Sequence, residues 1–426
     1  MTAAMFASMI IFFAFSIPIA VSIGFAGTAS LFFFSNTPML VVPKEMFSSI
    51  DKFALGAIPF FILAGNLMEV GGISNRLVNF AKSIVGGLQG GLGITCVMTC
   101  MIFAAVSGSS VATTFAIGAI LIPALIKHGY PTNFAAALQA TSAELGVIIP
   151  PSIPMILYGV SAEVSIGELF IAGFGPGLLI GGGLMFFVWI WSKIKGYGKD
   201  DHVGRMTFGH ATREAALALM MPVIILGGIY GGVFTPTEAA VVAVFYALIV
   251  GMGIYKEIKV KDLFPIFRKS VISSAVIMFI IANAGLFSFL ITRAGVPEAI
   301  GDFLKAHLTS GAMFLIGVNA ALFVIGMFIE TSASIIVLAP ILAPVAQKFG
   351  IDPVHFGTIM VVNLALGMIT PPFGVNLFAA CTVARISLDK IVRELIPFVL
   401  TVLTCLMIIT YVPQISLFLR DWVYGY

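Results

Sequence analysis

The chain has 426 residues, of which 60% are hydrophobic and only 10% charged, and its net charge is +3. Soluble domains are about 25% charged, so this composition excludes a soluble enzyme, a disordered chain and a fibrous protein. Because a membrane span needs about 20 apolar residues, the chain has room for roughly ten crossings in the lipid bilayer. We expect an all-α polytopic membrane protein. Its small positive excess indicates loop topology rather than nucleic-acid binding.

Apolar segments follow one another along the whole chain. They cover residues 5–34, 53–70, 92–127, 132–158, 168–192, 214–234, 236–255, 270–292, 311–348, 353–384 and 390–419. The first is too long and too poor in charge for a cleaved signal peptide, so we interpret it as a retained span. Segments 92–127 and 311–348 are too long for one crossing and contain small polar residues in the middle. We therefore predict two re-entrant helical hairpins there.

The basic loops predict the orientation in the membrane. Loops 193–213 and 256–269 each carry five Lys or Arg residues, those of the first being Lys193, Lys195, Lys199, Arg205 and Arg213. Two spans separate the loops, so both lie on one side, which the positive-inside rule makes cytoplasmic. Counting spans from there places the N-terminus in the cytoplasm and the C-terminus outside.

An internal repeat is the most informative feature. A shift of 221 residues without gaps brings Pro150-Pro151 onto Pro371-Pro372 and aligns further prolines and glycines. The loop at 161–170 is acidic, whereas its counterpart at 382–394 is basic, so the two loops are expected on opposite sides. Inverted repeats with broken helices are typical of secondary transporters, whose site lies at the repeat interface.

These observations predict four parts. They are N-terminal scaffold spans at 1–70; a first inverted repeat at 71–192, with hairpin 92–127 and broken helix 132–158; a basic loop and scaffold spans at 193–292; and a second inverted repeat at 293–426, with hairpin 311–348 and broken helix 353–384.

Each repeat contributes a polar hairpin tip and a proline break. The tips begin near Ser107 and Glu330, and the breaks lie near Pro150 and Pro371. Proline removes backbone donors and frees carbonyls upstream, and these carbonyls with Ser and Thr hydroxyls suit sodium. Helix N-termini after each break suit a carboxylate. The alternative is that the small residues only let helices pack closely.

Several acids and amides lie in or beside apolar segments. Glu330, at the second tip, is a candidate to support a cation site. For Glu144 we favour a structural role, bonding to backbone freed by Pro150. Asn376 is the best amide candidate for substrate contact, and Glu238 is expected to cap the helix after Thr235. Segments 42–52 and 296–309 are expected to lie in the membrane interface.

At these motifs the sequence resembles the large (DctM-type) membrane subunit of the tripartite ATP-independent periplasmic (TRAP) transporters, over essentially its whole length. The motifs are Ser107–Thr113, Ile149–Pro154, Phe234–Ala240 and Ile369–Gly374. The resemblance implies an elevator-type secondary transporter in the bacterial inner membrane, with its C-terminus in the periplasm. It also implies a separate small membrane subunit, a periplasmic substrate-binding protein, and at least two sodium ions as coupling ions, with no other cofactor and no transition metal.

The resemblance also assigns site residues. Sodium is expected at the first tip and break, through Ser107, Gly108, Ser109, Gly146 and Pro150, and at the second, through Glu330, Thr331, Gly367, Thr370 and Pro371. The organic acid is expected between the tips, near Ser110, Thr113, Ser332, Ser334, Gly374 and Asn376.

The chain looks most like the subunits that import sialic acid, because Ala143–Gly146 departs from the pattern associated with many dicarboxylate transporters. A C4-dicarboxylate or other carboxylate is the alternative substrate. Two other classes compete: an anion channel, which hairpin tips also suit, and an intramembrane hydrolase built on Ser107 or Ser109. A nucleophilic serine needs a positioned base, and all five histidines fall in loops or at segment ends. We therefore expect no enzyme.

Overall fold

The computed structural model describes residues 2–198, 206–308 and 310–425, and within these ranges its regular structure is entirely helical. Lys199 and Arg205 of the predicted basic loop lie outside the described residues. The helices are α1 (Thr2–Ala14), α2 (Ile19–Phe34), α3 (Val41–Ile50), η1 (Phe53–Gly56), α4 (Ala57–Val70), α5 (Ile73–Val85), α6 (Gly91–Ser107), α7 (Ser110–Lys127), α8 (Thr132–Ala143), α9 (Leu145–Ile148), α10 (Ile153–Ser161), α11 (Ile166–Lys195), α12 (Phe208–Tyr230), α13 (Pro236–Leu248), η2 (Ile249–Ile254), α14 (Val260–Arg293), α15 (Val296–His307), α16 (Gly311–Gly326), α17 (Thr331–Lys348), α18 (Pro353–Met368), α19 (Val375–Ala384), α20 (Leu388–Tyr411) and α21 (Gln414–Tyr424).

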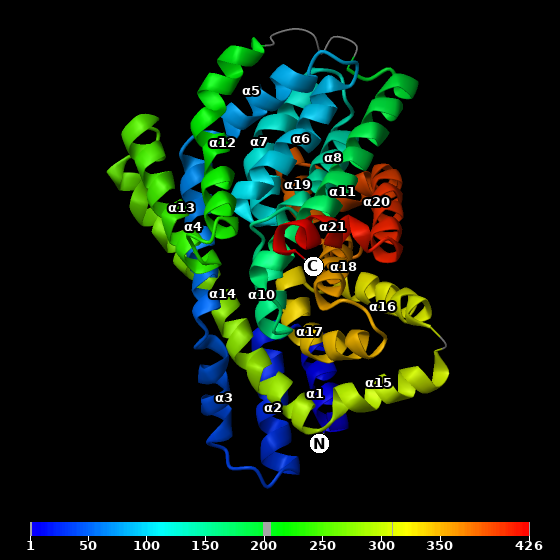
Figure 1. Ribbon diagram of the computed structural model, residues 1–426. Coiled ribbons are helices and arrows are strands. Elements are labelled where there is room, and N and C mark those ends of the chain that lie inside the picture. Colours follow the sequence, from blue (N-terminus) through cyan, green and yellow to red (C-terminus); the bar gives the residue numbers. More distant parts are fainter. Residues whose placement is uncertain (1, 199–205, 309, 426) are drawn as a thin grey trace.

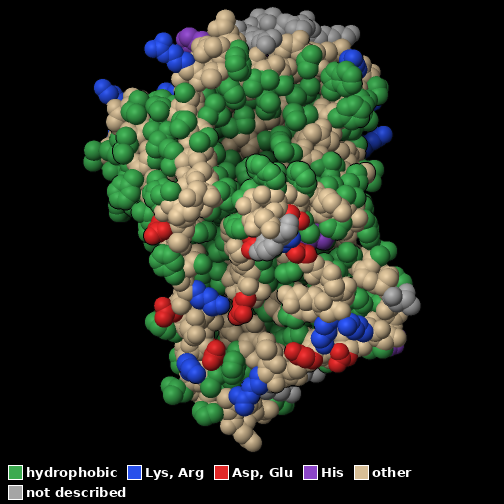
Figure 2. All heavy atoms as spheres, viewed as in Figure 1, with side chains coloured by type: hydrophobic (Ala, Val, Ile, Leu, Met, Phe, Trp, Pro, Cys, Tyr) green, Lys and Arg blue, Asp and Glu red, His purple; other side chains and the backbone are tan. Residues whose placement is uncertain are grey.

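The predicted polytopic membrane fold is confirmed. Eight helices of the described chain are long and apolar enough to cross a membrane, and a ninth span results if the pair Thr132–Ile148 and Ile153–Ser161, bent by 43°, is counted as one. Figure 2 shows hydrophobic side chains over much of the surface; charged side chains lie in the lower third and at the upper edge, and further ones lie at mid-height. This distribution fits a lipid-facing belt.

The prediction of one span at 5–34 is wrong. The segment forms two short helices, α1 and α2, which pack against each other at the lower end of the molecule (Figure 1). The chain turns between them at Ser16, whose φ of 58° lies in the left-handed region. Pro18 follows, just ahead of α2. Its ring fixes φ, and the backbone N–H that proline lacks is not needed before the first turn of a helix. The placement of the N-terminus in the cytoplasm counted residues 5–34 as one crossing of the membrane. That placement therefore stays a prediction.

The long helix α14 connects the N-terminal helices to the rest of the chain. It packs against α2, α3, α4 and α17, and α4 also packs against α13. In Figure 1, α14 runs diagonally down the molecule toward α15. The start of α13 carries the predicted cap: Glu238 N–H donates to Thr235 Oγ1 (3.3 Å), and Thr235 N–H donates to Glu238 Oε2 (2.8 Å). Two donors at the helix start are thus satisfied.

The two repeats contain matching elements in the same order. Each has two helices joined by a short tip, α6–α7 and α16–α17, followed by a helix that stops at a double proline. The shift of 221 residues brings both ends of α7 onto those of α17 and the start of α8 onto that of α18. Both Pro-Pro peptide bonds are cis. The predicted tips and breaks are therefore present, while the inversion of the repeats and the re-entry of the hairpins stay predictions.

The core of the molecule lies where the two repeats meet. All residues of α18 from Val354 to Met368 are buried, as are those of α8 from Phe134 to Ala143. Helix α8 packs against α6, α7, α19 and α20, and α18 packs against α16, α17 and α20. The first break, at residues 149–152, is therefore held inside protein, where interrupted backbone is tolerated at membrane depth, whereas Pro372 and Phe373 of the second break are exposed.

The C-terminal helix α21 ties the repeats together. Arg420, on α21, donates from Nη1 to Asp352 Oδ2 (2.8 Å), and the same nitrogen lies 4.0 Å from Glu168 Oε2 at the start of α11. Asp352 also uses Oδ1 to cap α18, accepting from Val354 N–H (2.8 Å) and His355 N–H (3.0 Å). One aspartate thus both begins a core helix and anchors α21.

Candidate functional site

The first tip is a sharp turn that only glycine fits. Gly108 has a φ of 60°, and a Cβ added there would lie 2.9 Å from the carbonyl oxygen of Pro151. Gly108 also accepts a backbone hydrogen bond from Ile153 N–H, at 3.4 Å. The tip of the first hairpin is therefore packed directly on the first break, as predicted.

Oxygen atoms gather between this tip and the break. Thr113 Oγ1 donates to the Ser109 carbonyl (2.8 Å) and lies 3.0 Å from Ser107 Oγ. A Cβ added at Gly146 would lie 2.7 Å from Thr113 Oγ1 and 2.8 Å from the Ser109 carbonyl. The missing side chain of Gly146 thus lets the backbone before Pro150 approach these oxygens. This arrangement brings together Ser107, Ser109, Thr113 and Gly146, and it is suited to a hard monovalent cation.

The second tip is built on the same plan with a different cap. Ser109 and Glu330 correspond under the shift of 221 residues, and they cap α7 and α17: Ser109 Oγ accepts from Ala112 N–H (3.4 Å), and Glu330 Oε2 accepts from Ala333 N–H (3.2 Å). Glu330 Oε1 also accepts from Ser332 Oγ at 2.9 Å. The second tip therefore carries a carboxylate where the first carries a hydroxyl.

The second break packs closely on the second hairpin. The contacts are made by the backbone of Gly367 and by the thioether of Met368. A Cβ at Gly367 would overlap the backbone of Gly326, at the end of α16. Thr331 Oγ1 lies 2.9 Å from Met368 Sδ, whereas the Thr370 hydroxyl is turned to the Leu366 carbonyl of its own helix (2.8 Å). Ser334 is buried with no hydrogen-bond partner for its hydroxyl. Pro371 and Gly374 complete the break ahead of α19.

A cavity of about 570 Å³ lies between the two tips and the helices α4 and α14. The predicted site residues that line it are Ser107, Gly108, Ser109, Ser110, Glu330 and Ser332. Helices α7 and α17 both begin at this cavity. Helix N-termini carry partial positive charge and free N–H groups. The other predicted residues do not line this cavity.

The predicted site contained none of the residues that α4 and α14 contribute, although the sequence marks Glu69 as an acid at the edge of an apolar segment and Asn66 as a buried amide expected to bond between helices. Lys269 and Glu69 line the cavity and form an ion pair, Lys269 Nζ to Glu69 Oε2, at 2.9 Å. Beside them Asn66 Nδ2 donates to Ser270 Oγ at 2.8 Å. The charge pattern had assigned Lys269 only to a topological loop. The available signal was an acid at the end of one apolar segment and a base at the start of another, both near a membrane boundary.

Asn376 and Glu144 differ from their predicted roles. Asn376 is fully buried, does not line the cavity, and donates through Nδ2 to Glu144 Oε1. Glu144 in turn bonds this amide of the second repeat rather than the backbone freed by Pro150. The physical reason is that α8 and α19 pack closely in the core, so these two polar side chains meet each other before either reaches open space.

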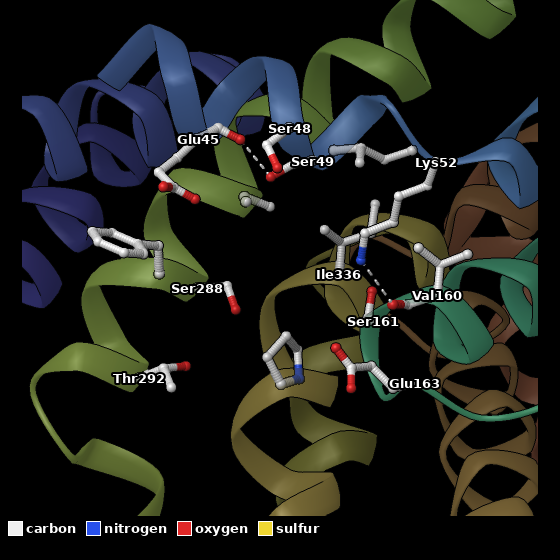
Figure 3. Close-up of a pocket in the computed structure, with 15 residues that line it drawn as sticks. Glu45, Ser48, Ser49, Lys52, Val160, Ser161, Glu163, Ser288, Thr292 and Ile336 are labelled. Atoms are coloured by element: carbon white, nitrogen blue, oxygen red, sulfur yellow. Dashed lines mark hydrogen bonds between the residues drawn. The ribbon is translucent and has the colours of Figure 1, made fainter. Parts of the chain in front are cut away.

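A second cavity, of about 340 Å³, lies between α3 and α14 on one side and α10 and α17 on the other (Figure 3). Lys52 Nζ donates across it to the Val160 carbonyl at 3.5 Å. Its lining includes the hydroxyls of Ser48, Ser161 and Ser288, which Figure 3 shows around the opening, but none of the predicted site residues. This cavity marks the boundary between the N-terminal helices and the repeats.

Comparison with known proteins places the whole chain in one family. Residues 6–415 match the family described as the tripartite ATP-independent periplasmic transporter, DctM component. The chain is 43% identical to the isethionate TRAP transporter permease protein DctMQ of Oleidesulfovibrio alaskensis over 97% of its own length, but it spans only 65% of that relative. It is 42% identical to the C4-dicarboxylate TRAP transporter large permease protein DctM of Rhodobacter capsulatus, over 95% of both chains.

A sialic acid relative is more distant. The chain is 36% identical to the sialic acid TRAP transporter large permease protein SiaM of Vibrio cholerae, over 96% of both chains. The prediction of a sialic acid subtype is therefore not supported, because Ala143–Gly146 is too short a segment to outweigh the whole chain. Among solved structures, the crystal structure of the Alcanivorax borkumensis YdaH transporter has a TM-score of 0.63 at 16% identity, covering 89% of this chain and 88% of that one. That likeness concerns the fold alone.

The fold, the two tips and the sequence match agree. This multi-pass membrane protein belongs to the DctM family, the large permease components of tripartite ATP-independent periplasmic transporters, and is a transport component rather than an enzyme.

Proposed function

We propose that the chain is the large permease subunit of an importer that couples the uptake of a small organic acid, foremost a C4-dicarboxylate, to sodium. It works in the bacterial inner membrane with a small membrane subunit and a periplasmic binding protein. The single observation that carries this proposal is the cavity where two helix N-termini and Lys269 converge.

The cavity has the chemistry of an anion site. The N-termini of α7 and α17 offer backbone N–H groups and partial positive charge, and Ser110 and Ser332 offer hydroxyl donors. Lys269 supplies an ammonium group at the cavity wall, where it is paired with Glu69, and the carboxylate of Glu330 lines the same cavity. A dicarboxylate has two anionic ends, so one end binds at the tips and the other at Lys269.

Sodium binds behind the anion in this proposal. The first site uses the oxygens that gather at Ser107, Ser109 and Thr113 against Gly146 and Pro150. The second uses the tip at Glu330 and Thr331 with the break at Gly367, Thr370 and Pro371. Ser334 and Gly374 support the second tip and break. Each cation moving inward down a membrane potential gains ~2.3 kcal/mol per 100 mV, so sodium offsets the charge of the acid.

Transport follows an elevator movement of the two inverted repeats against the scaffold. The scaffold contributes Asn66, Glu69 and Lys269 from α4 and α14, and the repeats contribute both tips. The anion therefore lies at the moving boundary, where a slide of the repeats exposes it alternately to each side.

The substrate proposal rests on the relatives of the chain. The C4-dicarboxylate permeases of Rhodobacter capsulatus and Pseudomonas aeruginosa are 42% and 41% identical, whereas the sialic acid permease of Vibrio cholerae is 36% identical. Sulfonates are the next class to test, given the isethionate relative.

The test is uptake into proteoliposomes that contain this chain and its small subunit, with the cognate binding protein added. Labelled succinate, sialic acid and isethionate are compared with and without an inward sodium gradient. We expect saturable succinate uptake that requires both sodium and the binding protein. Sodium-dependent uptake of sialic acid alone would overturn the substrate proposal. Succinate flux that ignores both sodium and the binding protein would favour an anion channel.

A further inference from the structure

One face of α14 runs from the cavity between the tips to the second cavity. The lining residues that it contributes to the two cavities are spaced three or four positions apart, and residues at this spacing share one face of a helix. From the first cavity to the second they are Lys269, Ser273, Ile277, Ile281, Gly285 and Ser288. This face is polar at both ends and apolar or small in the middle.

Two helices of the repeats also connect the cavities. Pro154 at the start of α10 and Ser332 at the start of α17 line the cavity between the tips, whereas Ser161 and Pro340 of the same helices line the second cavity. The two positions are seven residues apart in α10 and eight in α17. At 1.5 Å per residue, a slide of about 10–12 Å brings the start of each helix to the second cavity.

The contact between α14 and α17 is suited to such a slide. Val337 and Ile341 of α17 pack in one apolar cluster with Leu286 and Leu290 of α14. Apolar contacts are not directional, so one helix can move along the other without exchanging hydrogen bonds. The polar groups that an anion needs then lie at the two ends of the movement.

The scaffold wall of each cavity carries one lysine and one glutamate. In the cavity between the tips, Lys269 is paired with Glu69 at 2.9 Å. In the second cavity the two residues are Lys52 and Glu45. Among the described residues Lys52 forms no ion pair, and its Nζ donates to the carbonyl of Val160 in α10, at 3.5 Å (Figure 3). A slide of α10 takes this carbonyl away and leaves the ammonium group without its partner.

We propose that Lys52 is the basic residue of the anion site in the opposite transport state. After the repeats slide by about two helical turns, the tips face the second cavity, and the carboxylate that met Lys269 meets Lys52 and the hydroxyl of Ser288. The ligand is the small organic acid of the proposed function, on which this inference rests. It adds a residue that the described arrangement keeps away from the tips.

The acids of the second cavity fit this assignment. Glu163 lies on the repeat side, just after α10, and moves away with that helix. Glu45 stays on the scaffold beside Lys52, as Glu69 stays beside Lys269. Before the slide Lys52 is held by the carbonyl of the repeats, so the second cavity does not yet bind the acid.

Uptake kinetics in proteoliposomes test the assignment. For Lys52→Gln we expect the concentration of loaded binding protein that gives half-maximal succinate uptake to rise at least about tenfold, as the loss of a hydrogen bond to a charged group implies. The maximal rate is expected to stay unchanged. Lys44→Gln is the matched control, because Lys44 is an exposed base on α3 that lines neither cavity, and both values are expected to stay as in the wild type.

Two kinetic results would overturn the assignment. One is a half-maximal concentration that Lys52→Gln leaves unchanged. The other is a changed maximal rate at an unchanged concentration, since Lys52 would then act only by holding the repeats through Val160.

Two binding measurements exclude other roles of Lys52. Protection of Val111→Cys from alkylation by succinate reports on the cavity between the tips, which Val111 lines, and is expected to be the same with and without Lys52→Gln. The affinity of the complex for the loaded binding protein, measured by surface plasmon resonance without sodium, is also expected to be unchanged. A loss of protection would make Lys52 a residue that the fold needs, and a loss of affinity would make it a docking residue; either result overturns the assignment.

Cysteine pairs test whether the tips reach the second cavity. Because the slide brings Pro154 to the place of Ser161, a short bifunctional thiol reagent is expected to join Ser48→Cys to Ser161→Cys in the complex at rest. It is expected to join Ser48→Cys to Pro154→Cys only when loaded binding protein and sodium are present. Mass spectrometry of digested complex measures both products. Absence of the second product in a double variant that takes up succinate would overturn the proposal.

The outcomes separate this inference from the proposed function. A wild-type complex that takes up no succinate would remove the proposed function and this inference with it. Sodium-dependent uptake by the wild type, beside unaltered kinetics of Lys52→Gln, would remove this inference alone.

Discussion

At the scale of single residues, Lys269 contributes the basic side chain of the cavity lining, opposite the carboxylates of Glu69 and Glu330. It projects from α14 toward the two tips, and its pairing with Glu69 at 2.9 Å fixes the ammonium group at the cavity wall. The tips supply only partial charges from helix N-termini, each worth about 0.3–1 kcal/mol to an anion. In the proposed function, a dicarboxylate therefore depends on Lys269 for recognition of its second carboxylate.

We expect Lys269→Gln to weaken succinate binding. A hydrogen bond to a charged group contributes about 1.5–3 kcal/mol. The concentration of loaded binding protein that gives half-maximal uptake therefore rises about ten- to a hundredfold. Lys261→Gln, an exposed base on the same helix, is the matched control and leaves uptake unchanged. The measurement is the initial rate of labelled succinate uptake against the concentration of loaded binding protein. An unchanged rate curve for Lys269→Gln would place the anion elsewhere.

At the scale of elements, α21 is held on the core by the pairing of Arg420 with Asp352. Burial opposes ionisation of Asp352, but Arg420 and the backbone N–H groups of His355 and Val354 outweigh it and hold the pKa of this carboxyl below its ordinary value. A carboxyl with a lowered pKa stabilises the fold above its unfolded pKa of about 3.9. The contribution is therefore complete at neutral pH and is lost only as the pH falls through the folded pKa.

Asp352→Asn is expected to separate the two roles of this side chain. Asparagine still caps α18 through its carbonyl oxygen but no longer pairs ionically with Arg420, so we expect a loss of about 1 kcal/mol, the upper end of the range for exposed pairs. Asp352→Ala loses the cap as well and costs about 1 kcal/mol more. Chemical denaturation of the detergent-solubilised protein at neutral pH measures both. Equal stability of the two variants would mean that Asp352 does not cap α18. The control Asp302→Asn alters a pair whose aspartate is 76% exposed and is expected to change little.

The sequence predicted those elements whose cause is local. The double prolines break their helices because proline lacks the backbone N–H donor. Thr235 and Glu238 cap α13 within a segment of four residues. Both features can therefore be predicted from the local sequence. The turn at Ser16 was missed because a single proline within an apolar run does not distinguish a kink from a reversal. The pairs Lys269–Glu69 and Asn376–Glu144 join residues 200 and 232 positions apart. Their existence depends on how helices pack, which a composition pattern does not contain.

At the scale of the whole molecule, the second cavity separates two bodies that the elevator proposal sets in relative motion. Ser48 on α3 and Ser288 on α14 lie on the scaffold side, and Ser161 at the end of α10 lies on the repeat side. Lys52 donates to the Val160 carbonyl across this boundary. A slide of the repeats changes the distances from Ser48 and Ser288 to Ser161. It leaves the distance between Ser48 and Ser288, which both lie on the scaffold, unchanged.

Cross-linking across this boundary is expected to stop transport. In a double variant, Ser48→Cys with Ser161→Cys, a reducible bifunctional thiol reagent ties scaffold to repeats, and we expect succinate uptake to fall to background and to recover on reduction. The pair Ser48→Cys with Ser288→Cys is the matched control, since both positions belong to the scaffold, and its cross-link leaves uptake intact. Full uptake in the cross-linked Ser48–Ser161 variant would exclude a sliding movement at this boundary.

The most direct test of the central claim is substrate protection of the cavity between the tips. Val111→Cys places one thiol in the cavity lining, whereas the four native cysteines are buried. We predict that succinate slows alkylation of this thiol in the purified complex of large and small subunits when sodium is present, and that Ser48→Cys in the second cavity reacts at an unchanged rate. An alkylation rate at position 111 that is the same with and without succinate and sodium would contradict the account.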